Sequence, residues 1–340
     1  MQLSSYGLIG CGRFGQFCVQ ALANHSHVRP LAVADGDAEA AQRLAAAFGL
    51  QACSPAELLQ RVDLVHIATP PATHFELARQ ALEAGVAVLC EKPLALSVAD
   101  CDQLLALARA PLGANHLLRF NPLVGLVEQI LASGVLGQPL HAFFENYAQD
   151  EHLGPQHWFW DRSLSGGIFL EHAVHFFDLH RLWFGPGEIL QAVAQTRPGT
   201  DQQDRVFSLA RHGQVLVTSY HGFDQPARLD RADHRILCQR GQLELLGWIP
   251  MKLRATGLTP DQIQSLTALA KLPPQASDDQ LVWRLEVDRS ELYASMFCSL
   301  VSDLLGPRRL TAEDAREAVR LSEAATRTAE MSGTVGHSRQ

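Results

Sequence analysis

The chain has 340 residues, of which 47% are hydrophobic and 19% are charged, and its formal net charge is -8. This length exceeds one ordinary core, so two domains are expected, and the composition is that of a globular protein rather than a disordered or fibrous one. The acidic balance, without a cluster of Lys and Arg, argues against nucleic acid as a partner.

Seven cysteines are scattered along the sequence without a Cys-x-x-Cys pair. This pattern argues against a disulfide framework and against structural zinc. The sequence shows neither a cleavable leader nor an apolar run of about 20 residues that would span a bilayer. We therefore expect a cytoplasmic protein without a membrane partner.

From Tyr6 to about His116, short apolar runs alternate with helix-like stretches. The runs are apolar at consecutive positions, as parallel strands covered on both faces require. The expected strands are Gly7–Ile9, Leu31–Ala34, Leu64–Ala68 and Val86–Cys90, with helical periodicity over Phe14–Asn24 and Thr73–Ala84. This alternation predicts an α/β fold with a doubly wound parallel Rossmann sheet over residues 1–118.

The run Gly10-Cys11-Gly12-Arg13-Phe14-Gly15 follows the first strand and opens a helix. In a dinucleotide site the first glycine makes the tight turn, the second admits the pyrophosphate, and the third lets the helix pack closely on the sheet. The helix N-terminal amides of Arg13, Phe14 and Gly15 then face the phosphates. The motif predicts a bound dinucleotide.

Asp35 ends the second expected strand, where a carboxylate can accept hydrogen bonds from the adenosine ribose. A carboxylate there repels a 2′-phosphate, and no basic residue follows until Arg43, so NAD is favoured over NADP. NADP stays an alternative because Arg13 can reach the adenosine end of the cofactor.

Beyond Arg119 the pattern changes. A helix is expected near Leu123–Ser133, followed by runs that alternate polar with apolar residues, as half-buried strands do. These runs are Leu140–Tyr147, Leu190–Gln195, Val206–Ala210, Gln214–His221 and Gln242–Leu246. They predict an α+β domain over residues 119–332 with a mostly antiparallel sheet, whose open face favours a homodimer or homotetramer.

The C-terminal third contains one segment that interrupts this pattern, residues 250–287, interpreted as an insertion that lids the site. Within it a helix over Thr259–Leu272 ends at two prolines, and Gln275–Asp279 is expected to be an exposed loop. Final helices are expected over Asp288–Leu305 and Thr311–Met331, and the last can pack on the first domain. Residues 333–340 are predicted to be a flexible tail.

Three further motifs identify a family resemblance: Glu91-Lys92-Pro93, Thr69-Pro70-Pro71-Ala72-Thr73-His74, and the run from Gly166 to Asp178 that contains Glu171, His172 and His175. Together they resemble the glucose-fructose oxidoreductase, inositol dehydrogenase and MocA (Gfo/Idh/MocA) family over nearly the whole chain. The resemblance implies an NAD(P)-dependent oxidoreductase in which Lys92 and His175 act at the substrate. It also implies that Thr69, Pro70, His74 and Glu91 lie along the cofactor and that the Lys92-Pro93 bond is cis.

The chemistry of these residues agrees with that assignment. Alcohol oxidation needs a group that takes the hydroxyl proton as hydride leaves, and histidine titrates near working pH. We therefore expect His175 as general base and Lys92 as the group that polarises the substrate oxygen, although the two roles can be exchanged. In an α-helix Glu171, His175 and Asp178 share one face, so a carboxylate can orient the imidazole or contact the substrate.

Two departures from the family leave the substrate open: Glu171 stands where Asp is usual, and Ala173 where Gly is usual. Asn115 and Arg119 are further substrate candidates, with a domain hinge as the alternative for Arg119. Trp158 offers an aromatic face to a sugar ring or belongs to an aromatic core. No metal site is expected from His172 and its neighbours.

The function predicted is a dehydrogenase or reductase acting on a secondary hydroxyl or carbonyl of a sugar, inositol or related polyol. One alternative is a reductase of a non-sugar substrate such as a diol, imine or tetrapyrrole. Another is a regulator that senses NAD without catalysis, against which the presence of both Lys92 and His175 argues.

Overall fold

The computed structural model describes residues 3–149, 153–306 and 308–334, which form two compact units. The first unit comprises Met1–Leu117, Arg162–Gly166 and Ser290–Arg320, and the second comprises Leu118–Asp161, Gly167–Arg289 and Leu321–Gln340. Of the predicted tail, residues 333 and 334 end a helix, and residues 335–340 lie outside the described residues.

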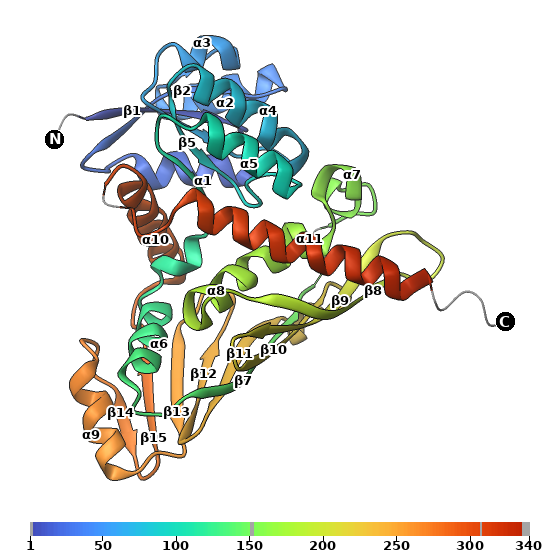
Figure 1. Cartoon of the computed structure of the whole chain (residues 1–340). Helices are drawn as coiled ribbons and strands as arrows, with labels where there is room; N and C mark the ends of the chain where they lie inside the picture. The colour runs from blue at the N-terminus through green and yellow to red at the C-terminus, as the bar shows by residue number, and fades with distance from the viewer. Residues whose placement is uncertain (1–2, 150–152, 307, 335–340) are drawn as a thin grey trace. The chain divides into compact units, whose positions relative to one another are not determined.

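A six-stranded parallel sheet forms the centre of the first unit (Figure 1). Its strands are β1 (Ser4–Ile9), β2 (Val28–Ala34), β3 (Gln51–Ala52), β4 (Leu64–Ile67), β5 (Ala87–Cys90) and β6 (Leu112–Ala114). Their order in the sheet is β3-β2-β1-β4-β5-β6, which is the doubly wound dinucleotide-binding arrangement. The predicted Rossmann sheet is confirmed, and β3 and β6 are too short to show a readable periodicity.

Helices cover both faces of this sheet. Its central strands β4 and β5 are therefore buried along their whole length. The elements are α1 (Arg13–Leu22), α2 (Ala38–Phe48), α3 (Pro55–Leu59), η1 (Pro71–Thr73), α4 (His74–Glu83), α5 (Val98–Leu107), α7 (Arg162–Ser165) and α10 (Arg289–Leu304). Helix α1 contacts α2, and α4 contacts α5, as pairs on opposite faces of a doubly wound sheet do.

A nine-stranded sheet dominates the second unit. Its strands are β7 (Pro139–Tyr147), β8 (Glu188–Thr196), β9 (Gln203–His212), β10 (Val215–Gly222), β11 (Arg231–Cys238), β12 (Gly241–Leu246), β13 (Lys252–Thr256), β14 (Gln275–Ser277) and β15 (Gln280–Arg284). The order is β14-β15-β13-β12-β11-β7-β10-β9-β8, and every neighbouring pair is antiparallel except β7 with β10. The predicted mostly antiparallel sheet is confirmed.

One face of this sheet is covered by helices (Figure 1). The remaining elements of the chain are η2 (Leu117–Phe120), α6 (Pro122–Ser133), η3 (Trp158–Trp160), the π-helical turn η4 (Phe169–Ala173), α8 (Val174–Phe184), η5 (Ala227–Leu229), α9 (Pro260–Leu269) and α11 (Ala312–Thr334). Phe144 on β7 and Phe176 on α8 stack with ring centroids 3.7 Å apart on the covered face. The strands alternate buried with exposed residues, so the other face carries its own exposed side chains.

The structure corrects one part of the expectation for residues 250–287, the exposed loop over Gln275–Asp279. Strands β13 and β15 extend the nine-stranded sheet, and the predicted loop after Pro273 and Pro274 begins with β14, which pairs with β15. Helix α9 is confirmed, with Thr259 as its N-cap in a capping box. Strands β13 and β15 have five residues each, flank the α9 segment and were not predicted from the sequence.

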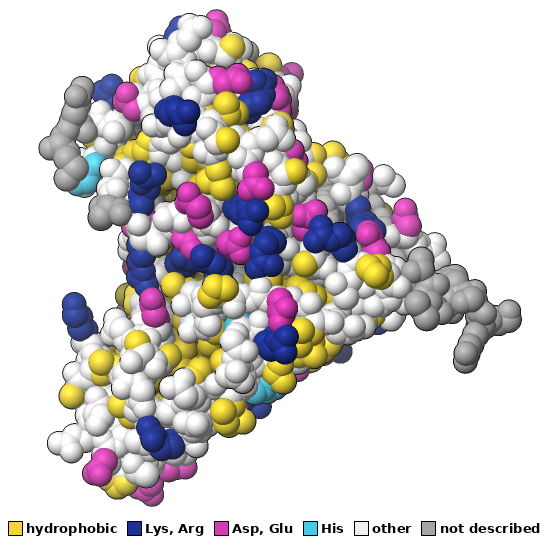
Figure 2. All heavy atoms as spheres, in the orientation of Figure 1, with side chains coloured by type: hydrophobic (Ala, Val, Ile, Leu, Met, Phe, Trp, Pro, Cys, Tyr) yellow, Lys and Arg dark blue, Asp and Glu magenta, His cyan; other side chains and the backbone are white. Residues whose placement is uncertain are grey.

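Acidic and basic side chains are interspersed on the face of the molecule that Figure 2 shows. Within the described ranges, no helix combines the length and the apolar character that crossing a bilayer requires.

Candidate functional site

The glycine turn at the end of β1 has a geometry that only glycine permits at two of its three positions. Gly10 has φ +106°, and a Cβ added there would lie 2.3 Å from the backbone oxygen of Ala68. A Cβ on Gly15 would lie 2.1 Å from the backbone oxygen of Gly10. Gly12 has no atom within 4 Å of its ideal Cβ position, so the backbone there faces open space that a ligand can enter.

Helix α1 presents an uncapped N-terminus at this turn. Its N-cap is Gly12, no side chain caps it, and the first turn contains no acidic residue. The first backbone N–H groups of a helix lack intrahelical partners and carry partial positive charge. Arg13 is exposed, whereas the Phe14 ring packs against Phe297 of α10 with centroids 6.5 Å apart, so Phe14 contributes its backbone rather than its ring to the open side.

Asp35 follows β2 and lies beside the glycine turn. Its Oδ2 accepts from the Cys11 backbone N–H at 2.6 Å, and its Oδ1 accepts from the Asp37 N–H at 2.8 Å. These bonds hold the carboxylate in place beside the glycine turn, and its contact with a ribose stays a prediction. The next basic residue, Arg43 on α2, forms ion pairs with Asp37 at 3.5 Å and with Glu39 at 3.3 Å. Its charge is therefore engaged by acidic side chains at the start of the same helix.

His74 is fully buried and holds two backbone segments of the site together. Its Nδ1 lies 2.7 Å from the Pro93 carbonyl oxygen, and its Nε2 lies 2.8 Å from the Thr69 carbonyl oxygen. Burial lowers the pKa of His74, while the two carbonyl contacts oppose that shift. The structure thus places His74 beneath the Thr69-Pro70 turn as its support, rather than at an exposed surface where a cofactor would contact it.

Lys92 lies two residues after the end of β5 and is half-buried, and its bond to Pro93 is cis, as the family resemblance implies. The preceding Glu91 accepts at Oε1 from Asn115 Nδ2 at 2.8 Å, and the same atom lies 2.9 Å from His66 Nε2. The predicted residues Lys92, Glu91 and Asn115 therefore gather at the carboxyl ends of β5 and β6. This is the edge at which open α/β sheets bind ligands.

In the second unit, the turn that carries Glu171 differs from the expected helix. Residues Phe169–Ala173 form a π-helical turn, and α-helical geometry starts at Val174, just before His175. A π turn contains more residues than an α turn, so the inference that Glu171 and His175 share one α-helical face does not hold as stated.

Arg119 and Asp178, both predicted to contact the substrate, are paired with each other. The guanidinium Nε and Nη2 donate to the two carboxylate oxygens at 2.7 and 2.6 Å. Their side chains are only 3% and 1% exposed. A bidentate pair of this kind satisfies both charges without a ligand, so the structure gives the two residues a role in holding α8 next to η2.

Trp248 is a residue of this region that the sequence did not suggest. Its ring stacks on His172 at 5.2 Å and 18°, and lies at 5.2 Å and 85° to His175. It follows Gly247, which has φ +97°, in the β12–β13 turn. Asn121 Nδ2 holds the same turn by donating to the Pro250 carbonyl at 2.9 Å. A Trp after a turn glycine is the signal that could have drawn attention to it.

Further buried histidines lie near His172 and around α8. His221 is 5.3 Å from His172 between ring centroids, and His234 is 5.6 Å from His180. Burial lowers the pKa of His221 and of His234 to about 3, and that of His180 well below its ordinary value. These rings are therefore neutral at physiological pH, packed among aromatic side chains.

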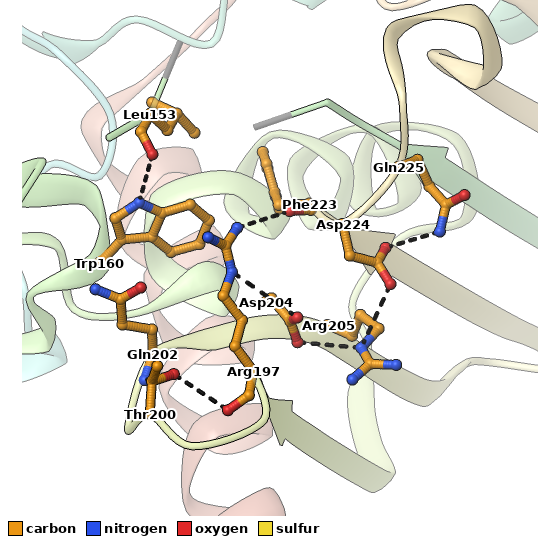
Figure 3. Close-up of polar contacts among 10 residues, drawn as sticks. All are labelled: Leu153, Trp160, Arg197, Thr200, Gln202, Asp204, Arg205, Phe223, Asp224 and Gln225. Carbon is orange, nitrogen blue, oxygen red and sulfur yellow. Dashed lines mark hydrogen bonds and ion pairs between the residues drawn. The ribbon is translucent and has the colours of Figure 1, made fainter. Parts of the chain in front are cut away.

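Trp158, predicted as a sugar platform or core residue, packs half-buried against a core cluster that includes Phe223. Its neighbour Trp160 donates from Nε1 to the Leu153 carbonyl at 3.0 Å, and the Arg197 guanidinium lies 4.0 Å from the centre of a Trp160 ring. Figure 3 shows Arg197 reaching from β8–β9 to this segment. These contacts of Trp160 with Leu153 and Arg197 hold the segment that contains Trp158.

The described residues contain no group of three or more His, Cys, Asp or Glu arranged to hold a metal ion.

Comparison with known proteins identifies both units. A family model for the oxidoreductase family with NAD-binding Rossmann fold (GFO_IDH_MocA) matches residues 4–111. A model for the GFO/IDH/MocA C-terminal domain matches residues 124–244. The two matches together span more than half of the chain.

Among relatives, inositol 2-dehydrogenase of Rhizobium meliloti (strain 1021) is 30% identical over 185 residues, which are 53% of this chain and 54% of that protein. UDP-N-acetylglucosamine 3-dehydrogenase of Acidithiobacillus ferrooxidans is 32% identical over 202 residues, 58% of this chain and 60% of that protein. The matches thus span little more than half the length of these curated relatives. The structure of levoglucosan dehydrogenase with NADH and levoglucosan superposes with a TM-score of 0.81 at 19% identity, covering 97% of this chain and 98% of that one.

Proposed function

The chain belongs to the Gfo/Idh/MocA oxidoreductase family, and we propose that it transfers a hydride between NAD and a secondary hydroxyl or carbonyl of a sugar, inositol or related polyol. One observation carries the proposal: Lys92 stands at the carboxyl end of β5, on the same sheet edge as the glycine turn and Asp35. The names of the relatives, which act on inositol and a nucleotide sugar, support this substrate class.

The residues of the first unit fit NAD. The open space at Gly12 and the uncapped N-terminus of α1 suit a pyrophosphate, and the fixed Asp35 carboxylate suits two ribose hydroxyls. When bound, NAD accepts or donates the hydride. Because Arg43 is engaged by two acidic side chains, we infer that the Asp35 carboxylate favours NAD over NADP, and exposed Arg13 keeps NADP as the alternative.

In the catalytic step we assign transfer of the substrate's hydroxyl proton to His175, and stabilisation of the substrate oxygen to Lys92. The imidazole of His175 takes the hydroxyl proton during oxidation and returns it during reduction. The Lys92 ammonium stabilises negative charge on the substrate oxygen, and the opposite assignment of the two roles is the alternative. We assign Glu171 to substrate contact, because Asp178 is already paired with Arg119.

The proposal is tested by incubating the purified protein with NAD+ or NADP+ and a panel of inositols, polyols and sugars, with formation of reduced nicotinamide as the readout. We expect turnover with NAD+, and its loss in Lys92→Ala and His175→Ala with NAD+ binding retained. Turnover that survives both substitutions would contradict the assigned roles. Saturable NAD+ binding without turnover on any substrate would favour a sensor of the cofactor.

We also propose that the open face of the nine-stranded sheet is covered by a second copy of the chain. Large apolar side chains that are 37–45% exposed lie on strands β7 to β11 of this sheet: Leu140, Leu190, Val193, Phe207, Leu216 and Leu237. Val193 and Phe207 are direct cross-strand neighbours, which joins two of them into one patch. Light scattering should give a dimer or tetramer that Phe207→Asp dissociates, and a monomeric unsubstituted protein would contradict this.

A further inference from the structure

Four polar side chains form a buried row across neighbouring strands of the first unit. Tyr6 lies on β1, His66 on β4, Glu91 directly after β5, and Asn115 directly after β6. The Tyr6 hydroxyl is 2.8 Å from His66 Nδ1, His66 Nε2 is 2.9 Å from Glu91 Oε1, and Asn115 Nδ2 donates to that same oxygen at 2.8 Å. The row runs from the middle of β1 to the carboxyl ends of β5 and β6, where Glu91 precedes Lys92.

The hydrogens of the row can be assigned in one consistent way. Burial, followed by the effects of Cys18 and Glu91, raises the pKa of Tyr6, so its phenol is an O–H donor. If the Tyr6 hydroxyl donates to His66 Nδ1, then Nε2 carries the imidazole hydrogen and donates to Glu91. Asn115 Nδ2 also donates to Oε1 of Glu91. Every donor in the row thus points towards the Glu91 carboxylate, as the groups that orient a functional side chain do.

The row is shielded from water except at Glu91. Tyr6 and His66 are 0% exposed and Asn115 is 3% exposed, whereas the Glu91 side chain is 15% exposed. Phe297 of α10 covers the His66 ring at 5.5 Å between centroids. A buried hydrogen-bonded row under an aromatic cover has little freedom to rearrange, so the exposed part of Glu91 is held in one place.

Resting on the proposed function, we propose that this row is a positioning device that holds the Glu91 carboxylate at the nicotinamide end of the NAD site. Its negative charge makes the chain bind NAD+ more tightly than NADH. The oxidised nicotinamide ring is cationic and the reduced ring is neutral, so a fixed carboxylate nearby attracts only the oxidised form. His66 and Tyr6 do not touch the cofactor and act through Glu91.

The expected effect follows from the distance dependence of charge interactions near a protein surface. A single carboxylate within several ångströms of the ring favours NAD+ over NADH by about five- to tenfold. Loss of one hydrogen bond that orients the carboxylate reduces that preference by about two- to threefold. The order of effects is therefore Glu91, then His66, then Tyr6.

The experiment measures dissociation constants for NAD+ and NADH separately, by calorimetry, in the absence of substrate. Glu91→Gln should remove the preference for NAD+ by weakening NAD+ binding while NADH binding stays nearly constant. Glu91→Asp keeps the charge and should retain most of the preference. His66→Leu and Tyr6→Phe should lower the preference in part.

Val65→Ala is the matched control. Val65 neighbours His66 on β4, is 0% exposed and points to the other face of the sheet, so its truncation disturbs the same strand without touching the row. It should change the affinities for both cofactors equally. An unchanged NAD+ to NADH ratio in a folded Glu91→Gln protein would overturn the proposal, and Tyr6→Phe serves if His66→Leu fails to fold. If the unsubstituted protein binds neither cofactor, the proposed function itself is wrong.

Discussion

A buried polar row in the first unit and a group of buried histidines in the second are held in different ways. In the first, Tyr6, His66 and Glu91 are connected by hydrogen bonds that end at one partly exposed carboxylate. In the second, His221 and His234 lie among aromatic rings, with Phe144 at 5.2 and 4.5 Å between centroids. The difference shows what each arrangement can fix: a hydrogen-bonded row fixes the position of a charge, whereas ring packing fixes histidines in their neutral form.

The largest effect should come from the buried ion pair between Arg119 and Asp178 in the second unit. Arg119→Met leaves the Asp178 carboxylate buried without its bidentate partner, which should lower the free energy of unfolding by about 3–5 kcal/mol. Urea unfolding measures this. The double variant Arg119→Met, Asp178→Leu should recover much of the loss, and a mild effect of the single substitution would show that water reaches the carboxylate.

A smaller effect on stability is expected at the glycine turn, where Gly15 is needed for folding and Gly12 for binding of the cofactor. Gly15→Ala places a Cβ against the Gly10 carbonyl, and the forced shift should cost about 1–3 kcal/mol of stability. Gly12→Ala meets open space, so it should change stability by less than about 0.5 kcal/mol while weakening NAD+ binding, because its methyl group fills the space that suits the pyrophosphate. Equal loss of stability in both variants would contradict this division.

The histidines that are packed among aromatic rings predict that the stability of the second unit depends on pH. The pKa of His221 is lowered to about 3 in the folded protein, and an unfolded histidine has a pKa of about 6.5. The unfolded chain therefore binds more protons between these values, and stability that is fully present above pH 6.5 falls with acidification by at most about 1.4 kcal/mol per pH unit for each such histidine.

The variant His221→Phe sharpens this prediction. It removes one titrating ring while keeping an aromatic side chain, so the slope of unfolding free energy between pH 6 and 4 should become shallower by up to that amount. Thermal unfolding across this range measures the slope. If the slope is unchanged, acid sensitivity arises from other groups than the buried imidazoles.

The smallest effect is expected for an exposed ion pair of the first unit. Arg43→Gln breaks contacts to Asp37 and Glu39, but Arg43 is 65% exposed. Screening by water limits the loss of stability to less than about 0.5 kcal/mol, measured by urea unfolding. The same variant should leave the preference for NAD over NADP unchanged; a loss of that preference would show that Arg43 takes part in cofactor selection.

The parts of the site that depend on local backbone geometry could be predicted from the sequence. Gly10, Gly15 and Asp35 are placed by a strand, a turn and the next strand, so their spacing alone indicates their positions. The cis bond at Lys92-Pro93 is implied by the family resemblance of the Glu91-Lys92-Pro93 motif, not by local geometry. Fold class was equally accessible, because four consecutive apolar runs and the helices between them define a parallel sheet.

Features that depend on packing between distant segments could not be predicted. The partner of Asp178 lies 59 residues away on η2, and nothing in the sequence between them links the two. Trp248 lies against His175 from a turn between β12 and β13, far from His175 in the sequence, in which Gly247 has a positive φ and Asn121 binds the Pro250 carbonyl. The π-helical turn at Glu171 also escaped detection, since residue spacing in a helix is interpreted with α geometry unless a structure shows otherwise.

Strand β14 has a consequence for how copies of the chain can meet. It forms one border of the nine-stranded sheet, contains only three residues and comes directly after Pro273 and Pro274. A short border strand preceded by two prolines offers few free backbone N–H groups to an incoming strand. At this border the sheet therefore offers little to an added strand, which agrees with the proposal that a second copy covers the open face instead.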